Sequence, residues 1–230
     1  MKRITFPLLC IILFSFSGTM QAQDAAKDYD QVYGLDQTLC NGKKYNYFAT
    51  PGTTGHQYLV SPGYETGSVT LNVKHYQDVI LNFDIFNQQL LLQFSDGTGK
   101  VNIIEVSQAW LKGFRLGNKN FEFLTLEKEP LFYQVLGEAP VRILYYWRKS
   151  LNLNNTIGTS NYVFSAAVRD SFVLMDGKLK PFNSKRSLIR IFDAGYRSEI
   201  KSYLRKHKIK IRKASDQVMA EMITFIGHIK

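Results

Sequence analysis

Apolar and polar positions alternate in short runs through the middle of the chain, from Gly67 to Phe123. Val69, Leu71 and Val73, for example, are separated from one another by single polar residues. A period of two places such residues on one face of a β-strand and their polar neighbours on the other face. Polar turn clusters lie between the runs, so each strand can pair with the one before it. The pattern predicts an antiparallel meander.

Turn residues at the ends of these runs mark where hairpins should form. Gly117-Asn118 and Asp176-Gly177 are short sequences of the kind found in tight hairpins, and residues 96–99 form a longer turn rich in Gly. Strand-like runs continue to the Pro at position 181. We therefore expect a mainly β (α+β) protein in which residues 23–182 form an antiparallel β domain, either a sandwich or an open barrel.

Two features inside this domain are interpreted as surface elements. Asp78 and Asp84 fall on the same side of one predicted strand, about 20 Å apart along an extended chain. That separation is too large for the carboxylate pair of a glycosidase, so we expect both, with Asp96, to be solvated strand or turn residues. Residues 152–161 are rich in Asn, Thr and Ser, a composition that predicts a flexible surface loop.

The hydrophobic period changes after Asn183 from two residues to three or four, which is typical of amphipathic helices. Ser184 and Ser215 each stand where they can cap the start of a helix. Gly195 is expected to end the first helix. We expect residues 183–230 to form a helical C-terminal region that packs on the β domain.

The N-terminus has the layout of a secretory signal. Lys2 and Arg3 precede an apolar run over residues 6–16, which has signal length and is too short to span a bilayer as a helix. Ala22 is a small residue suited to the cleavage point. We predict a cleaved signal peptide over residues 1–22 and an exported mature chain that has no transmembrane segment.

Residue sets that mark catalytic or cofactor sites are not found in the sequence. The mature chain has four widely spaced His residues and one cysteine, Cys40, which excludes paired Cys ligands and an internal disulfide. A G-x-S-x-G nucleophile turn and a phosphate-binding Gly loop are also missing. We expect no cofactor, no metal and a non-enzymatic binding or accessory protein. The alternative is a hydrolase-like enzyme whose site is assembled from dispersed residues.

Positive charge is concentrated near the C-terminus of a chain whose net charge is +10. A short run there contains six cations: Arg205, Lys206, Lys208, Lys210, Arg212 and Lys213. The run is interpreted as a patch that binds an envelope protein or an anionic envelope component. Nucleic acid would fit the charge, but an exported protein rarely meets it, so we expect no nucleic-acid partner. The alternative is a solvated helix end, where cations are favourable.

A second candidate contact is the aromatic run Tyr145, Tyr146 and Trp147, close to the predicted loop. Exposed aromatic rings can stack on sugars or on the side chains of a partner. Within a strand, the same residues can instead fill the core. Both interpretations remain open from the sequence.

The order of these segments resembles a group of exported, β-rich proteins of Bacteroidetes whose activity is not known. The matching residues are 67–79, 81–86, 114–117 and 121 in the meander, 199–204 and 208–210 in the tail, and the signal ending in Gln21-Ala22-Gln23. The resemblance implies a Gram-negative envelope setting, with the protein periplasmic, associated with the outer membrane, or secreted. It implies no catalytic residues.

Overall fold

The computed structural model describes residues 36–47, 50–126, 129–156 and 159–229. The predicted signal peptide, residues 1–22, and the first part of the predicted β domain lie outside these described residues. Structural statements below refer to the described ranges.

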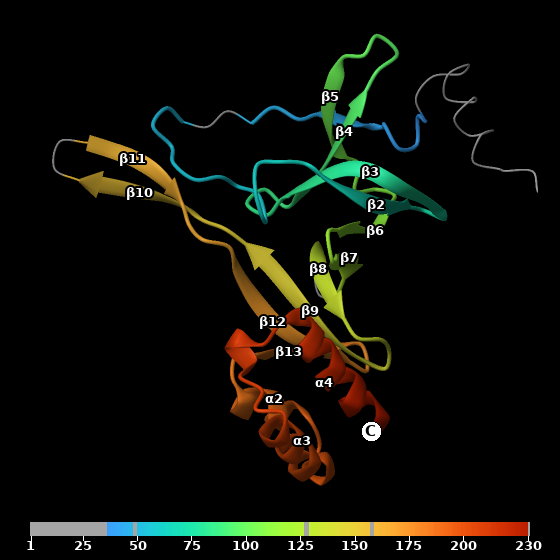
Figure 1. Cartoon of the computed structure of the whole chain (residues 1–230), viewed down its shortest axis with the longest axis vertical. Helices are drawn as coiled ribbons and strands as arrows, with labels where there is room; N and C mark the ends of the chain where they lie inside the picture. Colours follow the sequence, from blue (N-terminus) through green and yellow to red (C-terminus); the bar gives the residue numbers. More distant parts are fainter. Residues whose placement is uncertain (1–35, 48–49, 127–128, 157–158, 230) are drawn as a thin grey trace, which may run out of the picture. The chain divides into compact units, whose positions relative to one another are not determined.

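Antiparallel strands dominate the described part of the chain (Figure 1). One sheet has eleven strands in the order β1-β5-β4-β3-β2-β6-β7-β8-β9-β12-β13, and β10 and β11 form a separate two-stranded sheet. The strands are β1 (Gly42–Lys44), β2 (Glu65–Leu71), β3 (Lys74–Asp84), β4 (Gln89–Ser95), β5 (Val101–Val106), β6 (Leu111–Leu116), β7 (Lys119–Thr125), β8 (Pro130–Leu136), β9 (Val141–Arg148), β10 (Leu151–Thr156), β11 (Thr159–Phe164), β12 (Val168–Met175) and β13 (Lys178–Phe182).

Most neighbours in the large sheet are also neighbours in sequence, because tight turns join them. Asp176 and Gly177 both have positive φ, 52° and 71°, as the predicted hairpin between β12 and β13 requires. Three pairings join strands that are not consecutive: β1 with β5, β2 with β6 and β9 with β12. Strand β2 pairs with β3 on one side and with β6 on the other. The chain therefore extends the sheet first from β3 to β5 and then, in the opposite direction, from β6 onward.

Residues 152–156 and 159–161 belong to the antiparallel pair β10–β11, so the expectation of a loop is wrong for them. Neighbouring segments hold the base of this hairpin: Phe164 N donates to Thr54 O at 3.0 Å, and Thr54 N donates to Tyr162 O at 2.9 Å. The Phe164 ring also lies 5.4 Å from that of Phe86. Loop-like composition was overridden by these contacts with distant parts of the chain.

A first hydrophobic core lies among strands β2 to β8. Phe83 is at its centre and is fully buried. Its ring lies 5.2 Å from Phe114 and 5.3 Å from both Phe121 and Phe132, each in an edge-to-face arrangement. Such pairs are favourable because the positive edge of one ring meets the negative face of another. The period-two alternation along β3 predicts the inward direction of Phe83.

Helices follow the last strand. They are α2 (Lys185–Ile191), α3 (Ala194–Lys206), the 3-10 helix η1 (Ile211–Lys213) and α4 (Asp216–Ile229). Ser184 caps α2, and Ser215 Oγ accepts from Val218 N at the start of α4, as predicted. Gly195 does not end the first helix, because it lies inside the first turn of α3. The chain leaves α2 at Phe192, whose extended backbone directs a buried side chain into the core.

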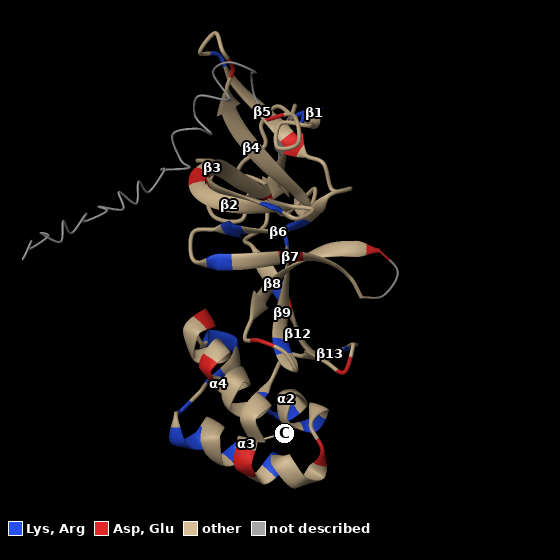
Figure 2. Cartoon of the chain, turned by 90° about the vertical axis from the view of Figure 1, so that its right-hand side faces the viewer, with Lys and Arg blue, Asp and Glu red and all other residues tan. Residues whose placement is uncertain are grey.

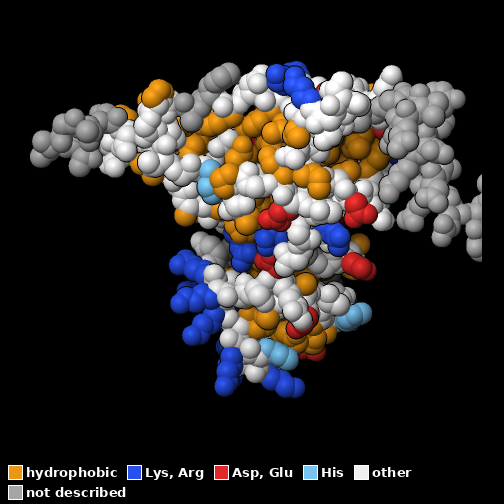
Figure 3. Space-filling model, turned by 45° about the horizontal axis from the view of Figure 1, so that its top comes forward, with side chains coloured by type: hydrophobic (Ala, Val, Ile, Leu, Met, Phe, Trp, Pro, Cys, Tyr) orange, Lys and Arg blue, Asp and Glu red, His pale blue; other side chains and the backbone are white. Residues whose placement is uncertain are grey.

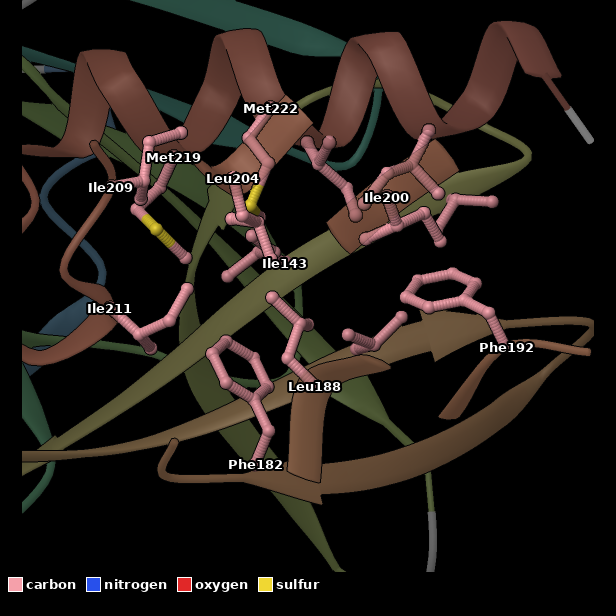
Figure 4. Close-up of a cluster of buried hydrophobic side chains, with 14 of the residues drawn as sticks. Ile143, Phe182, Leu188, Phe192, Ile200, Leu204, Ile209, Ile211, Met219 and Met222 are labelled. Carbon is pink, nitrogen blue, oxygen red and sulfur yellow. The ribbon is translucent and has the colours of Figure 1, made fainter. Parts of the chain in front are cut away.

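A second hydrophobic core joins these helices to the sheet (Figure 4). Ile143 from β9 is fully buried and faces Leu188 of α2, Leu204 of α3 and Met222 of α4. The helical region therefore packs on β9 and its neighbours. The fold class predicted from the sequence, a mainly antiparallel β-protein with a helical C-terminal region, is confirmed. None of the helices in the described ranges is long and apolar enough to cross a membrane.

Asp84 is fully buried, so the expectation that it is solvated is wrong. Its Oδ2 accepts hydrogen bonds from Tyr45 Oη and Asn87 Nδ2, both at 2.8 Å. Its Oδ1 accepts from the backbone N–H groups of Phe86 at 3.0 Å and Asn87 at 2.8 Å. These donors replace water around the carboxylate. Asp84 thereby fixes the turn after β3 to the segment that contains Tyr45.

Candidate anion-binding groove

The start of α2 and the link between α3 and α4 form the two walls of a basic groove. Its volume is about 300 Å³. The residues that line it are Asn183, Ser184, Lys185, Lys210, Ile211, Arg212 and Lys213. Three of these belong to the predicted basic patch, whereas Lys185 comes from a separate segment of the chain. We call this site the basic groove.

The link that carries Lys210 and Arg212 leaves α3 through a Schellman motif. Ile209 N donates to Leu204 O, and Lys208 N donates to Arg205 O, both at 3.0 Å. Lys208 takes the left-handed position with a φ of 51°, where Gly is more usual. The motif stops the helix inside the basic run and turns the chain back toward the core.

Two buried isoleucines fix this link to the hydrophobic core. Ile209 and Ile211 are each 8% exposed and belong to the core shown in Figure 4. The cations that alternate with them, Lys208, Lys210 and Arg212, are exposed. Alternation along the basic run thus places the apolar residues inside and the charges outside. The isoleucines are therefore buried while the charged side chains remain in contact with water.

The side chain of Arg212 is held in the wall of the groove by a hydrogen bond to a backbone carbonyl group. Its Nε donates to the carbonyl oxygen of Asn183 at 3.1 Å. This bond uses one of the five N–H groups of the guanidinium. Arg212 therefore connects the link to the end of β13.

The charge of the groove is not balanced by neighbouring carboxylates. Between residues 183 and 230 there are twelve Lys and Arg and four Asp and Glu. No ion pair formed within the described ranges includes any of the four groove cations Lys185, Lys210, Arg212 and Lys213. Lys and Arg lie along α2, α3 and the following link in Figure 2, and Figure 3 shows such side chains gathered on one side of this region. Like charges held together attract an anion.

A larger hollow of about 590 Å³ adjoins the basic groove and shares Asn183, Ile211 and Arg212 with it. The other residues that line this hollow are Arg169, Asp170, Ser171, Phe172, Pro181, Phe182 and Ser187. Strands β12 and β13 supply most of them. We call this site the β12–β13 hollow.

Both acidic and basic groups at the far side of the β12–β13 hollow are already paired. Arg169 Nη1 donates to Asp216 Oδ1 at 2.9 Å, and Arg148 Nε donates to Asp170 Oδ2 at 2.8 Å. Burial raises the pKa of Asp216, but hydrogen bonds from Lys119 and other donors outweigh it and hold that pKa below its ordinary value. Asp216 is thus ionised at neutral pH and neutralises Arg169.

The predicted basic patch is only partly gathered into one site. Lys210, Arg212 and Lys213 line the groove, whereas Arg205, Lys206 and Lys208 are exposed and lie outside its lining. Sequence reasoning missed Lys185, which the fold brings to the same groove. The signal available in the sequence was a cation directly after the capping residue Ser184, but nothing local links that position to the basic run.

The aromatic run is divided between the two faces of β9. Tyr145 is 1% exposed, its ring lies 4.0 Å from the Arg169 guanidinium, and burial raises its pKa to about 12. Tyr146 packs near Tyr133 on the other face, with the ring centroids 6.1 Å apart. Trp147 Nε1 donates to Gln134 Oε1 at 2.7 Å. These contacts are internal to the protein and do not gather the three rings on one exposed surface.

A third hollow, of about 780 Å³, contains two carboxylates and a histidine. Both oxygens of Glu122 accept from Arg142 Nη1 at 2.9 Å, while Glu138 and His228 are exposed. An ion-paired carboxylate among exposed groups lacks the nucleophile and base contacts that hydrolytic chemistry requires. In the described part of the chain, no group of three His, Cys, Asp or Glu could hold a metal ion. Cys40 is partly buried against the first core.

Comparison of the chain with protein-family models, with curated proteins and with solved structures found no match.

Proposed function

We propose that this chain is an exported cell-envelope protein that binds an anionic envelope component without catalysing a reaction. One observation carries the proposal: four cations from two separate segments line one groove, and none of them forms an ion pair with a carboxylate in the part of the chain that the structure describes. Clustered cations are costly unless an anion compensates their mutual repulsion. The signal-like N-terminus and the resemblance to exported proteins of Bacteroidetes support the envelope setting, either periplasmic or at the outer membrane.

The binding test compares two triple variants with the same change in net charge. In the groove variant, Lys210, Arg212 and Lys213 are each changed to Gln. In the control variant, the exposed residues Lys43, Lys100 and Lys112, which lie on or beside β1, β5 and β6, are changed to Gln. Cosedimentation of the mature chain, from residue 23, with phosphatidylglycerol-containing vesicles measures the affinity. Vesicles of phosphatidylcholine alone show binding that does not depend on anions.

We expect the wild-type chain and the control variant to bind the anionic vesicles alike. The groove variant should bind at least about tenfold more weakly, because each Lys or Arg near an anionic surface contributes about 1 kcal/mol. Equal weakening in both variants would show that only total charge matters and would exclude the groove as the site. If the wild-type chain and the control variant both fail to bind the anionic vesicles, the proposed function is contradicted.

The envelope setting has its own test. Expression in a Gram-negative host, followed by fractionation and mass spectrometry, should find a chain lacking residues 1–22 in the periplasm or with the outer membrane. A full-length chain in the cytoplasm would contradict export.

A further inference from the structure

The basic groove and the β12–β13 hollow form a continuous site with two different ends. They share Asn183, Ile211 and Arg212. At one end Lys185, Lys210 and Lys213 add positive charge and no acidic residue lines the wall. At the other end the residues that line the hollow include the apolar Pro181, Phe182 and the shared Ile211, whereas the ring of Phe172 lies on the opposite face of β12, near Tyr133. The site is therefore cationic at one end and partly apolar at the other.

Ion pairs increase the difference in charge between the two ends of the site. Arg169 and Asp170 both line the hollow, but each is bound to an opposite charge outside it, Asp216 and Arg148 respectively. The cation of the hollow without such a partner in the described structure is Arg212, which stands in the shared wall. An anionic group is therefore attracted to the shared wall and the groove beyond it, and not to the apolar end.

The dimensions suit a small ligand. A hollow of about 590 Å³ lies within the range of about 300 to 1,000 Å³ that is typical of small-molecule sites. Addition of an extended peptide strand is disfavoured at this edge, because β13 carries Lys178, Lys180 and Pro181. Proline lacks the N–H that a new strand needs, and edge lysines oppose pairing.

We propose, resting on the function proposed above, that the ligand is an amphiphilic anion with a phosphate-like head and an apolar chain. The head binds Lys210, Arg212 and Lys213 in the basic groove, where a guanidinium can give two parallel hydrogen bonds to phosphate oxygens. The chain lies in the β12–β13 hollow against Phe182 and Ile211. The apolar end separates such a ligand from free phosphate.

Calorimetric titration of the mature chain with three probes tests this assignment. The probes are octyl phosphate below its micelle concentration, inorganic phosphate, and octyl glucoside as the uncharged amphiphile. We expect octyl phosphate to bind at least about tenfold more tightly than inorganic phosphate, since burial of about two methylene groups suffices for that factor. Octyl glucoside should bind more weakly than octyl phosphate by a similar factor, because it leaves the cations without an anion.

Two kinds of variant separate the ends of the site. Arg212→Gln should weaken both phosphate probes. Ser171→Phe should weaken octyl phosphate about tenfold, because Ser171 lies on the same face of the sheet as Phe182 and a larger side chain there fills the hollow. The same variant should bind inorganic phosphate as the wild-type chain does, which also shows that it is folded.

Several outcomes would overturn the assignment. Equal affinity for octyl phosphate and inorganic phosphate, both weakened by Arg212→Gln, would establish an anion site without an apolar end; the proposed function would survive. If octyl glucoside binds as tightly as octyl phosphate, the cations of the groove do not contribute to binding. If octyl phosphate does not bind the wild-type chain, the assignment fails, and the vesicle experiment decides the proposed function separately.

Discussion

Asp216, in the first turn of α4, forms an ion pair with Arg169 of β12 through a 2.9 Å hydrogen bond between Nη1 and Oδ1. The other carboxylate oxygen accepts from Lys119 Nζ of β7 at 2.6 Å and from Gln134 Nε2 of β8 at 2.7 Å. Gln134 is itself fully buried. One carboxylate thus fixes the C-terminal helix to three strands, and it positions Arg169 beside the β12–β13 hollow.

Asp216→Asn should destabilise the protein by about 2 to 4 kcal/mol, because it leaves Lys119 and Arg169 without their counter-charge. Urea unfolding followed by circular dichroism measures the free energy. The control is Glu221→Gln on the same helix, where the exposed carboxylate accepts one bond from Gln217 at 3.1 Å. We expect the control to change stability by less than about 0.5 kcal/mol. Equal effects of the two substitutions would show that the Asp216 contacts do not stabilise the fold.

The contribution of Asp216 should depend on pH in a defined direction. Its pKa is lower in the folded chain than the unfolded value of about 3.9, so folding favours the ionised form. The stabilisation is therefore fully present above pH 4 and is lost as the pH falls through the folded pKa. Asp96, whose pKa is about 2 because of hydrogen bonds from Thr98 and Asn102, also titrates in acid. The difference in unfolding free energy between wild type and Asp216→Asn isolates the contribution of Asp216.

We expect that difference in unfolding free energy to stay constant from pH 7 to 5 and to shrink below pH 4. A difference that is the same at pH 2.5 and pH 7 would contradict the role of the ionised carboxylate.

Asp84→Asn should destabilise the fold by about 2 to 3 kcal/mol, because an amide NH₂ would face donors that now bind a carboxylate oxygen. Asp78→Asn is the matched control on the same strand. Asp78 is exposed and has a φ of 54°, a conformation that Asn tolerates well. Thermal unfolding of both variants is the measurement. A similar melting temperature for the two would mean that the hydrogen bonds of Asp84 contribute little.

Gly137→Ala should cost about 2 to 4 kcal/mol, combining left-handed backbone strain with overpacking. Gly137 has a φ of 77°, and an added Cβ would lie 2.4 Å from Cγ2 of Ile223 in α4. Gly97→Ala is the control, because no atom lies within 4 Å of the position of its added Cβ. Urea unfolding should leave the control near wild type. If Gly137→Ala is equally harmless, α4 can move away from the β8–β9 turn at little cost.

Local sequence patterns were sufficient for much of the fold. Alternation gave the direction of Phe83 in β3, Asp176-Gly177 gave a hairpin, and Ser184 and Ser215 gave two helix starts. Each of these features depends on residues within a few positions, whose φ preferences and hydrogen bonds are nearly the same in any fold. The basic run likewise located half of the groove, because Ile209 and Ile211 alternate with its cations.

The sequence by itself therefore determined the class of fold, the hairpins, the helix starts and the concentration of positive charge. Only the tertiary structure decided that Asp84 is buried, that residues 152–156 and 159–161 are in strands, and that Lys185 joins Lys210 in one groove. These outcomes rest on contacts between residues far apart in the chain, and their free energy comes from burial and from hydrogen bonds that form only once the segments have packed. Local composition carries no record of which distant partner will supply them.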